Sequence, residues 1–236
     1  MRILVPPGSA IVGQRTTLDE SEAHHLRVRR ARENEGVEVL DGAGLTGRGR
    51  LVRSGSDWQV EIESAERRPA QPDLTLAVAA GDRERFTWMS EKAVELGVTR
   101  IVPLETTHSR GVATRLKPAH MGKLERVVLE ATKQSGTAWA PEMETPVRLE
   151  SFLAGQLAGS GWLADPAGET PPAALNDTPV TVLIGSEGGF TTEERRAILQ
   201  AGYRAVVLGS HILRFETAAL AAAALVGAAR MRRNDG

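Results

Sequence analysis

The sequence predicts an α/β protein in two parts: a small β-barrel over residues 1–68 and a parallel sheet covered by helices over residues 74–236. Its length of 236 residues suits one large domain or two modest ones. The first part has the pattern of short strands with one helix, whereas strands and helices alternate in the second, as in parallel sheets with crossover helices. Between the parts, Pro69 and Pro72 stop both a helix and a central strand, so residues 67–73 are the expected linker.

In the first part, short apolar runs between turn clusters predict strands at residues 2–5, 37–40, 48–52 and 58–62. One helix is expected between the first two strands. It begins at Asp19, because Glu22 follows at the spacing of a capping box, and it extends to about Arg32.

In the second part, apolar runs predict strands at residues 74–79, 101–104, 161–164, 180–184 and 205–208. Helical spacing of Phe86, Met89, Ala93 and Leu96 predicts a helix that Gly97 ends. Pro118 opens a second helix, and further helices are expected at residues 192–201 and 216–230. The apolar face of the helix after Pro118 consists of Met121, Leu124, Val127 or Val128, and Ala131. This alternation indicates a parallel sheet with helices on both faces.

The composition excludes several classes of protein. The chain has 0 Cys, which rules out disulfide scaffolds, thiolate metal sites and cysteine nucleophiles and fits a reducing compartment. We expect a cytoplasmic protein without a membrane span, because no apolar run approaches about 18 residues and Pro6 and Pro7 interrupt the first one. No metal is expected, since adjacent His24 and His25 on a helix do not face one point. Lys plus Arg, 29, balances Asp plus Glu, 30, so a nucleic-acid partner would need a local basic patch.

Ligands of open parallel sheets bind beyond the carboxyl ends of the strands, which points to the loops after Leu104, Ile184 and Leu208. The segment GSEGGF at residues 185–190 directly follows a buried strand, and its glycines allow the backbone to approach a ligand closely. A branched side chain at Gly188 is therefore expected to abolish ligand binding. The segment has neither a phosphate-loop Lys nor a dinucleotide fingerprint, so ATP and NAD are not indicated. An ordinary strand-to-helix turn is the alternative interpretation.

The loop after Leu208 places Arg214 and Glu216 at the entry to the last helix. A helix N-terminus favours a carboxylate and disfavours an arginine, so Arg214 is expected to face an anionic or electron-rich group; a structural salt bridge is the alternative. The last helix has eight Ala between Ala218 and Ala229, which suits close packing, including packing against another subunit.

Together, LIGSEGGF and LGSHILRFETA closely resemble the two signature motifs of the RsmE family, which transfers methyl from S-adenosylmethionine to N3 of uridine in small-subunit ribosomal RNA. The resemblance covers nearly the whole chain. Other matching segments lie at residues 24–28 and 30, 91–98, 108–110, 130–131 and 134–136. The chain departs from the family pattern at Arg29, Ala80, Thr137, Ser186 and His211, and the missing basic residues at positions 80 and 137 concern the grip on RNA.

The resemblance implies a PUA-like RNA-binding barrel followed by a SPOUT (α/β-knot) domain with a trefoil knot. It implies a homodimer, 16S ribosomal RNA or the small ribosomal subunit as partner, and S-adenosylmethionine as methyl donor. The implied donor-binding residues, mainly through backbone and apolar contacts, are Leu104, Ile184, Gly185, Glu187, Gly188, Leu208, Ile212, Leu213 and Ala218. The implied RNA-binding residues are His25, Arg27, Arg30, Arg110 and Gln134.

The chemistry of the uridine imide suggests the catalytic group. N3 is mostly protonated at neutral pH, so its methylation requires loss of the proton and stabilisation of the anion over O2 and O4. Arg214 is the candidate, because its planar fork can donate to a carbonyl oxygen while its charge favours the imidate. Glu216 is either the base or, as the favoured role, a residue that orients Arg214 or its loop; water is another acceptor.

The first part offers arginines for phosphate binding. Arg27, Arg29, Arg30 and Arg32 lie within six residues, with Arg48, Arg50 and Arg53 on an expected hairpin; this favours RNA contact over a merely solvated face. Two alternatives remain: a SPOUT ribose 2′-O-methyltransferase and a non-catalytic RNA-binding assembly protein. The segment LGSHILRFETA favours uridine over ribose, and the intact glycine loops argue against a non-catalytic role.

Overall fold

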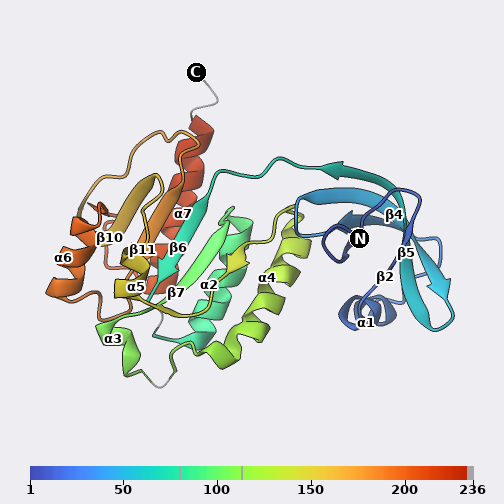
Figure 1. The fold of residues 1–236 in the computed structure, drawn as a ribbon, viewed down its shortest axis with the longest axis horizontal. Helices are drawn as coiled ribbons and strands as arrows, with labels where there is room; N and C mark the ends of the chain where they lie inside the picture. The colour runs from blue at the N-terminus through green and yellow to red at the C-terminus, as the bar shows by residue number, and fades with distance from the viewer. Residues whose placement is uncertain (80, 113, 233–236) are drawn as a thin grey trace. The chain divides into compact units, whose positions relative to one another are not determined.

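The computed structural model describes residues 1–79, 81–112 and 114–232, which form two compact units (Figure 1). The first unit is Met1–Ala70 with Leu129–Ala140, and the second is Gln71–Val128 with Pro141–Gly236. The family departure at Ala80 lies outside the described residues. The return of residues 129–140 to the first unit follows from no local sequence pattern.

The first unit is a five-stranded sheet with the strand order β1-β3-β4-β5-β2. Its pairs are antiparallel except β1 with β3. The strands are β1 (Arg2–Leu4), β2 (Arg15–Thr17), β3 (Gly36–Leu40), β4 (Leu45–Ser54) and β5 (Asp57–Arg67). The four predicted strands are confirmed; β2 was not predicted, because three residues are too few for an alternating pattern.

The helix of the first unit, α1 (Glu20–Val28), begins as predicted. The Glu22 N–H donates to Asp19 Oδ1 at 2.8 Å, the expected side-chain cap. The helix does not reach Arg32. It ends four residues earlier because Arg30 adopts a left-handed φ of 56° and the Ala31 N–H returns to the Leu26 carbonyl, which terminates the helical ladder.

The second unit contains the predicted parallel sheet, with strand order β12-β10-β11-β6-β7-β8, and β9 beside β7. Every pairing between these strands is parallel. The strands are β6 (Leu74–Val78), β7 (Arg100–Glu105), β8 (Glu142–Met143), β9 (Val147–Arg148), β10 (Ser160–Glu169), β11 (Val180–Ile184) and β12 (Arg204–Val206). Figure 1 shows β10, β11, β6 and β7 side by side in this unit.

Helices cover both faces of this sheet, as predicted. Leu76 and its neighbours on one face pack with residues of α2 and α7, whereas Ala77 on the other face packs with α5 and α6. The helices are α2 (Arg83–Glu95), α3 (Thr107–Arg110), α4 (Met121–Ser135), α5 (Leu149–Leu153), α6 (Thr192–Gln200) and α7 (Phe215–Met231), with a 3-10 turn at Pro118–His120. Gly97 ends α2 with φ of 76°, but Leu96, expected on the apolar face, is 36% exposed. Of the two candidates on α4, Val128 is the buried one.

Candidate active site

The carboxyl ends of β10, β11 and β12 border a cavity of about 350 Å³. Its walls are made by residues 163–166 within β10, the segments that follow β11 and β12, Arg195 of α6 and the start of α7. The lining residues are 163–166, 184–187, 189–190, 195, 207–209, 211–213, 215 and 218. Most of the walls are apolar side chains and backbone, so the cavity suits a flat, partly apolar ligand that is recognised through main-chain groups.

The structure brings together most of the residues expected to hold a methyl donor. Those that line the cavity are Ile184, Gly185, Glu187, Leu208, Ile212, Leu213 and Ala218. Leu104 and Gly188 do not line it. Leu104 is buried in the core on the α5–α6 face of the sheet, and Gly188 lies against His108.

The glycine-rich segment closes as a tight turn. The Gly189 N–H donates to the Ser186 carbonyl at 2.8 Å, and Gly189 has φ of 67°, a conformation that side chains disfavour. A Cβ at Gly185 would lie 2.9 Å from Gly189 Cα, so the turn also needs glycine there. Ser186, which departs from the family pattern, is buried on the cavity wall, and its hydroxyl has no hydrogen-bond partner within the described part of the chain.

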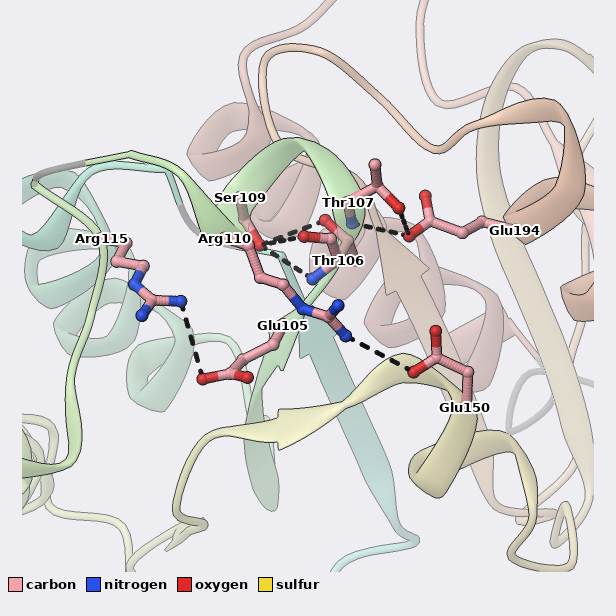
Figure 2. Close-up of polar contacts among 8 residues, drawn as sticks. All are labelled: Glu105, Thr106, Thr107, Ser109, Arg110, Arg115, Glu150 and Glu194. Atoms are coloured by element: carbon pink, nitrogen blue, oxygen red, sulfur yellow. Dashed lines mark hydrogen bonds and ion pairs between the residues drawn. The ribbon is translucent and has the colours of Figure 1, made fainter.

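The carboxylate of Glu194 joins the loop after β7 to Thr191, the residue that follows the turn; Figure 2 shows its contact with Thr107. The Thr107 N–H and hydroxyl donate to Glu194 Oε1 at 2.7 and 2.9 Å. The Thr191 N–H donates to Oε2 at 2.8 Å, and the Glu194 N–H donates to Thr191 Oγ1 at 3.1 Å; these two bonds form the capping box at the start of α6. Burial alone would raise the pKa of Glu194, but the N–H donors of Thr107 and Thr191 outweigh it and hold that pKa below its usual value.

His108 rests on the glycine turn. Its Nδ1 lies 3.2 Å from the Gly189 carbonyl, and a Cβ at Gly188 would come within 3.0 Å of the imidazole ring. Arg110, on the same short helix, is half-exposed and lies 3.9 Å from Glu150 (Figure 2). The loop therefore places His108 against the turn and Arg110 beside Glu150, and neither residue lines the cavity.

Arg214 and Glu216 both lie at the start of α7, but their side chains do not contact each other. Arg214 is exposed at the N-cap of α7, and its side chain has no ion pair or hydrogen bond among residues 1–79, 81–112 and 114–232. Glu216 is buried and lies 3.6 Å from Arg85 on α2, while its Oε2 has no partner there. The predicted role of Glu216, to orient Arg214 or its loop, stays a prediction; the contact that the structure shows is with Arg85.

Comparison with known protein families agrees with this arrangement. A model of the RNA methyltransferase domain matches residues 68–227, and a model of the RNA methyltransferase PUA domain matches residues 18–71. The ribosomal RNA small subunit methyltransferase E of Synechocystis is 30% identical over 96% of this chain and 77% of that protein. The chain belongs to the RsmE family. The RsmE protein of Rickettsia conorii is 26% identical over 91% of both chains.

Solved structures confirm the predicted fold class. The RsmE enzyme of Neisseria gonorrhoeae bound to S-adenosyl methionine has a TM-score of 0.83, with 27% identity over 94% of each chain. A Legionella pneumophila putative methyltransferase in complex with the same cofactor has a TM-score of 0.85, with 27% identity over 97% of each chain. The chain is thus an α/β protein with a PUA-like first part and a SPOUT second part.

Two charged residues on the cavity wall, Asp165 and Arg195, were not predicted from the sequence. Arg195 Nε donates to Asp165 Oδ2 at 2.7 Å, and both residues line the cavity. Burial alone would raise the pKa of Asp165, but the Ala167 N–H and Arg195 hold it below its usual value. Asp165 could have been suggested by its place before Pro166, directly after a predicted strand. No neighbouring residue in the sequence suggests a site role for Arg195 on α6.

The RNA-binding residues implied by the RsmE resemblance fall in different surroundings. Arg27 is paired with Glu20. The main-chain carbonyl of Gln134 accepts a hydrogen bond from Arg2 Nη1 at 2.5 Å. His25 and Arg30 are exposed. Of the arginine cluster, Arg50 pairs with Glu63 and Arg53 stacks on Trp58 at 3.8 Å. Arginine side chains without a partner in the described ranges of the first unit are Arg29, Arg30, Arg32 and Arg48.

Among the described residues, no group of three or more His, Asp or Glu has the arrangement of a metal site. In the same residues, no helix has the length and apolar character needed to cross a membrane.

Proposed function

We propose that this RsmE family member transfers a methyl group from S-adenosylmethionine to N3 of a uridine in 16S ribosomal RNA. The observation that carries the proposal is the cavity formed by the glycine turn and the 207–213 loop at the carboxyl ends of the strands. Apolar walls suit an adenosine, the turn offers backbone groups, and the buried Ser186 hydroxyl is available as a hydrogen-bond partner. S-adenosylmethionine would supply the electrophilic methyl group.

The catalytic role in this proposal belongs to Arg214. It lies between the cavity residues Leu213 and Phe215 in sequence, and its guanidinium has no partner within the described part of the chain. A free guanidinium can donate to O2 or O4 of the uracil and favour the imidate that forms when N3 loses its proton. The proton leaves to water in this scheme, because Glu216 is buried against Arg85.

Glu216 then acts on the position of Arg214. It lies in the first turn of α7, two residues after Arg214, and pairs with Arg85 of α2. This pairing fixes the first turn of α7, and with it the backbone from which Arg214 projects. A carboxylate at this end of a helix is also favoured by the helix dipole.

For the partners, we propose that the first unit grips RNA and that the protein works as a cytoplasmic homodimer. Arg29, Arg30, Arg32 and Arg48 are the candidates for phosphate contacts. Apolar side chains exposed on α2 and α7, Trp88 at 49% and Met231 at 67%, suit burial against a second copy. The domain limits of residues 1–68 and 74–236 and the trefoil knot remain part of this proposal.

The test is a mass-spectrometric comparison of ribosomal RNA nucleosides from cells with and without the gene. Loss of N3-methyluridine from 16S RNA, restored by the wild-type gene but not by an Arg214→Ala variant, is the expected result. Loss of a 2′-O-methylated nucleoside instead would favour the ribose alternative. An unchanged nucleoside profile would favour a non-catalytic assembly protein.

A further inference from the structure

The cavity carries a charge pattern that the proposed function leaves unused. The charged and titratable side chains among its lining residues are Asp165, Glu187, Arg195 and His211, so Arg195 supplies the one guanidinium, and Arg214 is not part of the wall. S-adenosylmethionine has two cationic groups, the sulfonium and the α-ammonium, and one anionic group, the α-carboxylate. One wall cation and one ligand anion are therefore available to pair.

We propose that Arg195, held in place by Asp165, binds the α-carboxylate of the methyl donor and selects ligands that carry the amino-acid tail. This inference rests on the proposed function and deepens it by assigning a subsite to the donor tail. No neighbouring motif requires an arginine here, because the capping box of α6 is completed by Thr191 and Glu194.

The pairing with Asp165 uses Nε of Arg195 and leaves its two Nη groups available for a ligand. Asp165 Oδ2 accepts Arg195 Nε at 2.7 Å, and the other carboxylate oxygen, Oδ1, accepts the Ala167 N–H at 2.8 Å. Both Nη groups of Arg195 are without a partner in the described residues. Two parallel Nη donors match the two oxygens of a carboxylate, which is the bidentate arrangement that guanidinium groups favour.

Asp165 makes Arg195 a fixed cation. The Asp165 side chain is only 14% exposed, whereas that of Arg195 is 45% exposed, so the aspartate is the anchored partner. Arg195 is thereby held in one geometry before the ligand arrives, which reduces the ordering cost of binding. Asp165 is a positioning residue in this arrangement, and Arg195 is the residue that touches the ligand.

Two ligands separate the tail contact from the rest of the cavity. S-adenosylhomocysteine carries adenosine, sulfur and the amino-acid tail, whereas 5′-methylthioadenosine carries adenosine and sulfur without the tail. Calorimetric titration of the full chain with both ligands measures the contribution of the tail directly. Arg196→Gln is the matched control, because Arg196 is the exposed neighbour on the same helix and does not line the cavity.

We expect Arg195→Gln to lower affinity for S-adenosylhomocysteine by about 10- to 100-fold, in the range of a charged hydrogen-bonded contact, and to leave affinity for 5′-methylthioadenosine unchanged. Asp165→Asn should reduce the preference for the tail by a smaller factor, and Arg196→Gln should not change it. Adding salt should weaken wild-type binding of S-adenosylhomocysteine more than that of Arg195→Gln.

Two results would overturn the inference. An equal loss of affinity for both ligands in Arg195→Gln would mean that Arg195 only maintains the cavity, and unchanged affinity for both would mean that it has no role. If the wild-type chain binds neither ligand, the methyl-donor site itself is wrong. The failure of this inference and of the proposed function therefore give different readings.

Discussion

At the scale of single residues, the proposed catalytic role of Arg214 can be tested most directly. Arg214→Lys keeps the charge but loses the planar fork, so we expect methyl transfer to fall by about 10- to 1000-fold, the usual cost of removing one oriented donor. Affinity for each substrate should change little, because the imidate develops toward the transition state. Raising the pH should recover part of the rate, since more uridine is then anionic without help. Single-turnover assays across pH measure both effects; a normal rate at neutral pH would move the catalytic role to Arg110.

The structure places Gly188 against His108 and not on the cavity wall, where its motif predicts a donor contact. The sequence favours Gly188→Val as a direct block of the donor, but Gly189 is the residue with positive φ on the cavity wall. At Gly188 a Cβ would meet the His108 ring at 3.0 Å. We therefore expect Gly188→Ala to lower the free energy of unfolding by about 1 kcal/mol through overpacking, and to affect donor binding only indirectly.

The His108→Ala background is the control for this interpretation. Removing the ring should reduce the cost of Gly188→Ala, measured by urea unfolding of the four variants of the cycle, while the contact with His108 Cβ at 3.1 Å stays. An equal cost in both backgrounds would show that the His108 ring is not what excludes a side chain at Gly188.

At the scale of elements, Glu194 joins α3 to α6 with three accepted hydrogen bonds. Glu194→Gln replaces one accepting oxygen by a donor, so we expect a loss of about 1–3 kcal/mol in the free energy of unfolding and faster amide exchange in residues 106–110. Glu193→Gln, an exposed neighbour, should have neither effect. Unchanged exchange in that segment would mean that Glu194 does not hold the turn.

The pH dependence of this effect has a definite sign. The pKa of Glu194 is lowered on folding from 4.5, so its carboxylate stabilises the fold fully above that pH. The stabilisation is lost as the pH falls through the lower pKa of the folded state. The difference between wild type and Glu194→Gln should therefore be constant near neutral pH and shrink in acid, as urea unfolding at several pH values would show.

Element by element, the sequence predicts what is long and periodic. The helices α2, α4, α6 and α7 have nine or more residues each, and their patterns were found because each helix buries one face over several turns. The helices α3 and α5, of four and five residues, are too short to show a helical period. The end of α1 was missed because Arg30 adopts a left-handed conformation, which arginine rarely does. Within the site, the glycine loops could be predicted because their residues are neighbours in the sequence. The Asp165–Arg195 pair could not, because its residues lie 30 positions apart.

At the scale of the whole molecule, the first unit depends on one buried ion pair between distant parts of the chain. Lys133 Nζ lies 2.8 Å from Glu22 Oε1, with both side chains under a tenth exposed. Burial is the largest influence on Glu22 and raises its pKa despite the lysine. Lys133→Met would leave a buried, uncompensated carboxylate, so we expect a loss of about 3–5 kcal/mol in the free energy of unfolding.

Two variants test that expectation by urea unfolding. Lys133→Met combined with Glu22→Gln should recover most of the loss, because no unpaired charge remains. Glu130→Gln removes the second, 55% exposed partner of Lys133 and should cost less than about 1 kcal/mol. A small loss for Lys133→Met alone would show that Glu22 accepts a proton at little cost when its partner is gone.

The return of residues 129–140 to the first unit also affects how the chain can fold during synthesis. Domains of a nascent chain generally fold in order from the N-terminus as they emerge from the ribosome. Here Glu22 is translated 111 residues before its partner Lys133, and the first unit lacks its last segment until residue 140 of 236 is made. The N-terminal unit therefore cannot be completed before a large part of the second unit, residues 71–128, has been made. A gene fragment that stops at the linker encodes neither unit in full, and in a nascent chain the first sheet lacks the packing of residues 129–140 while β6 and β7 of the second are being made.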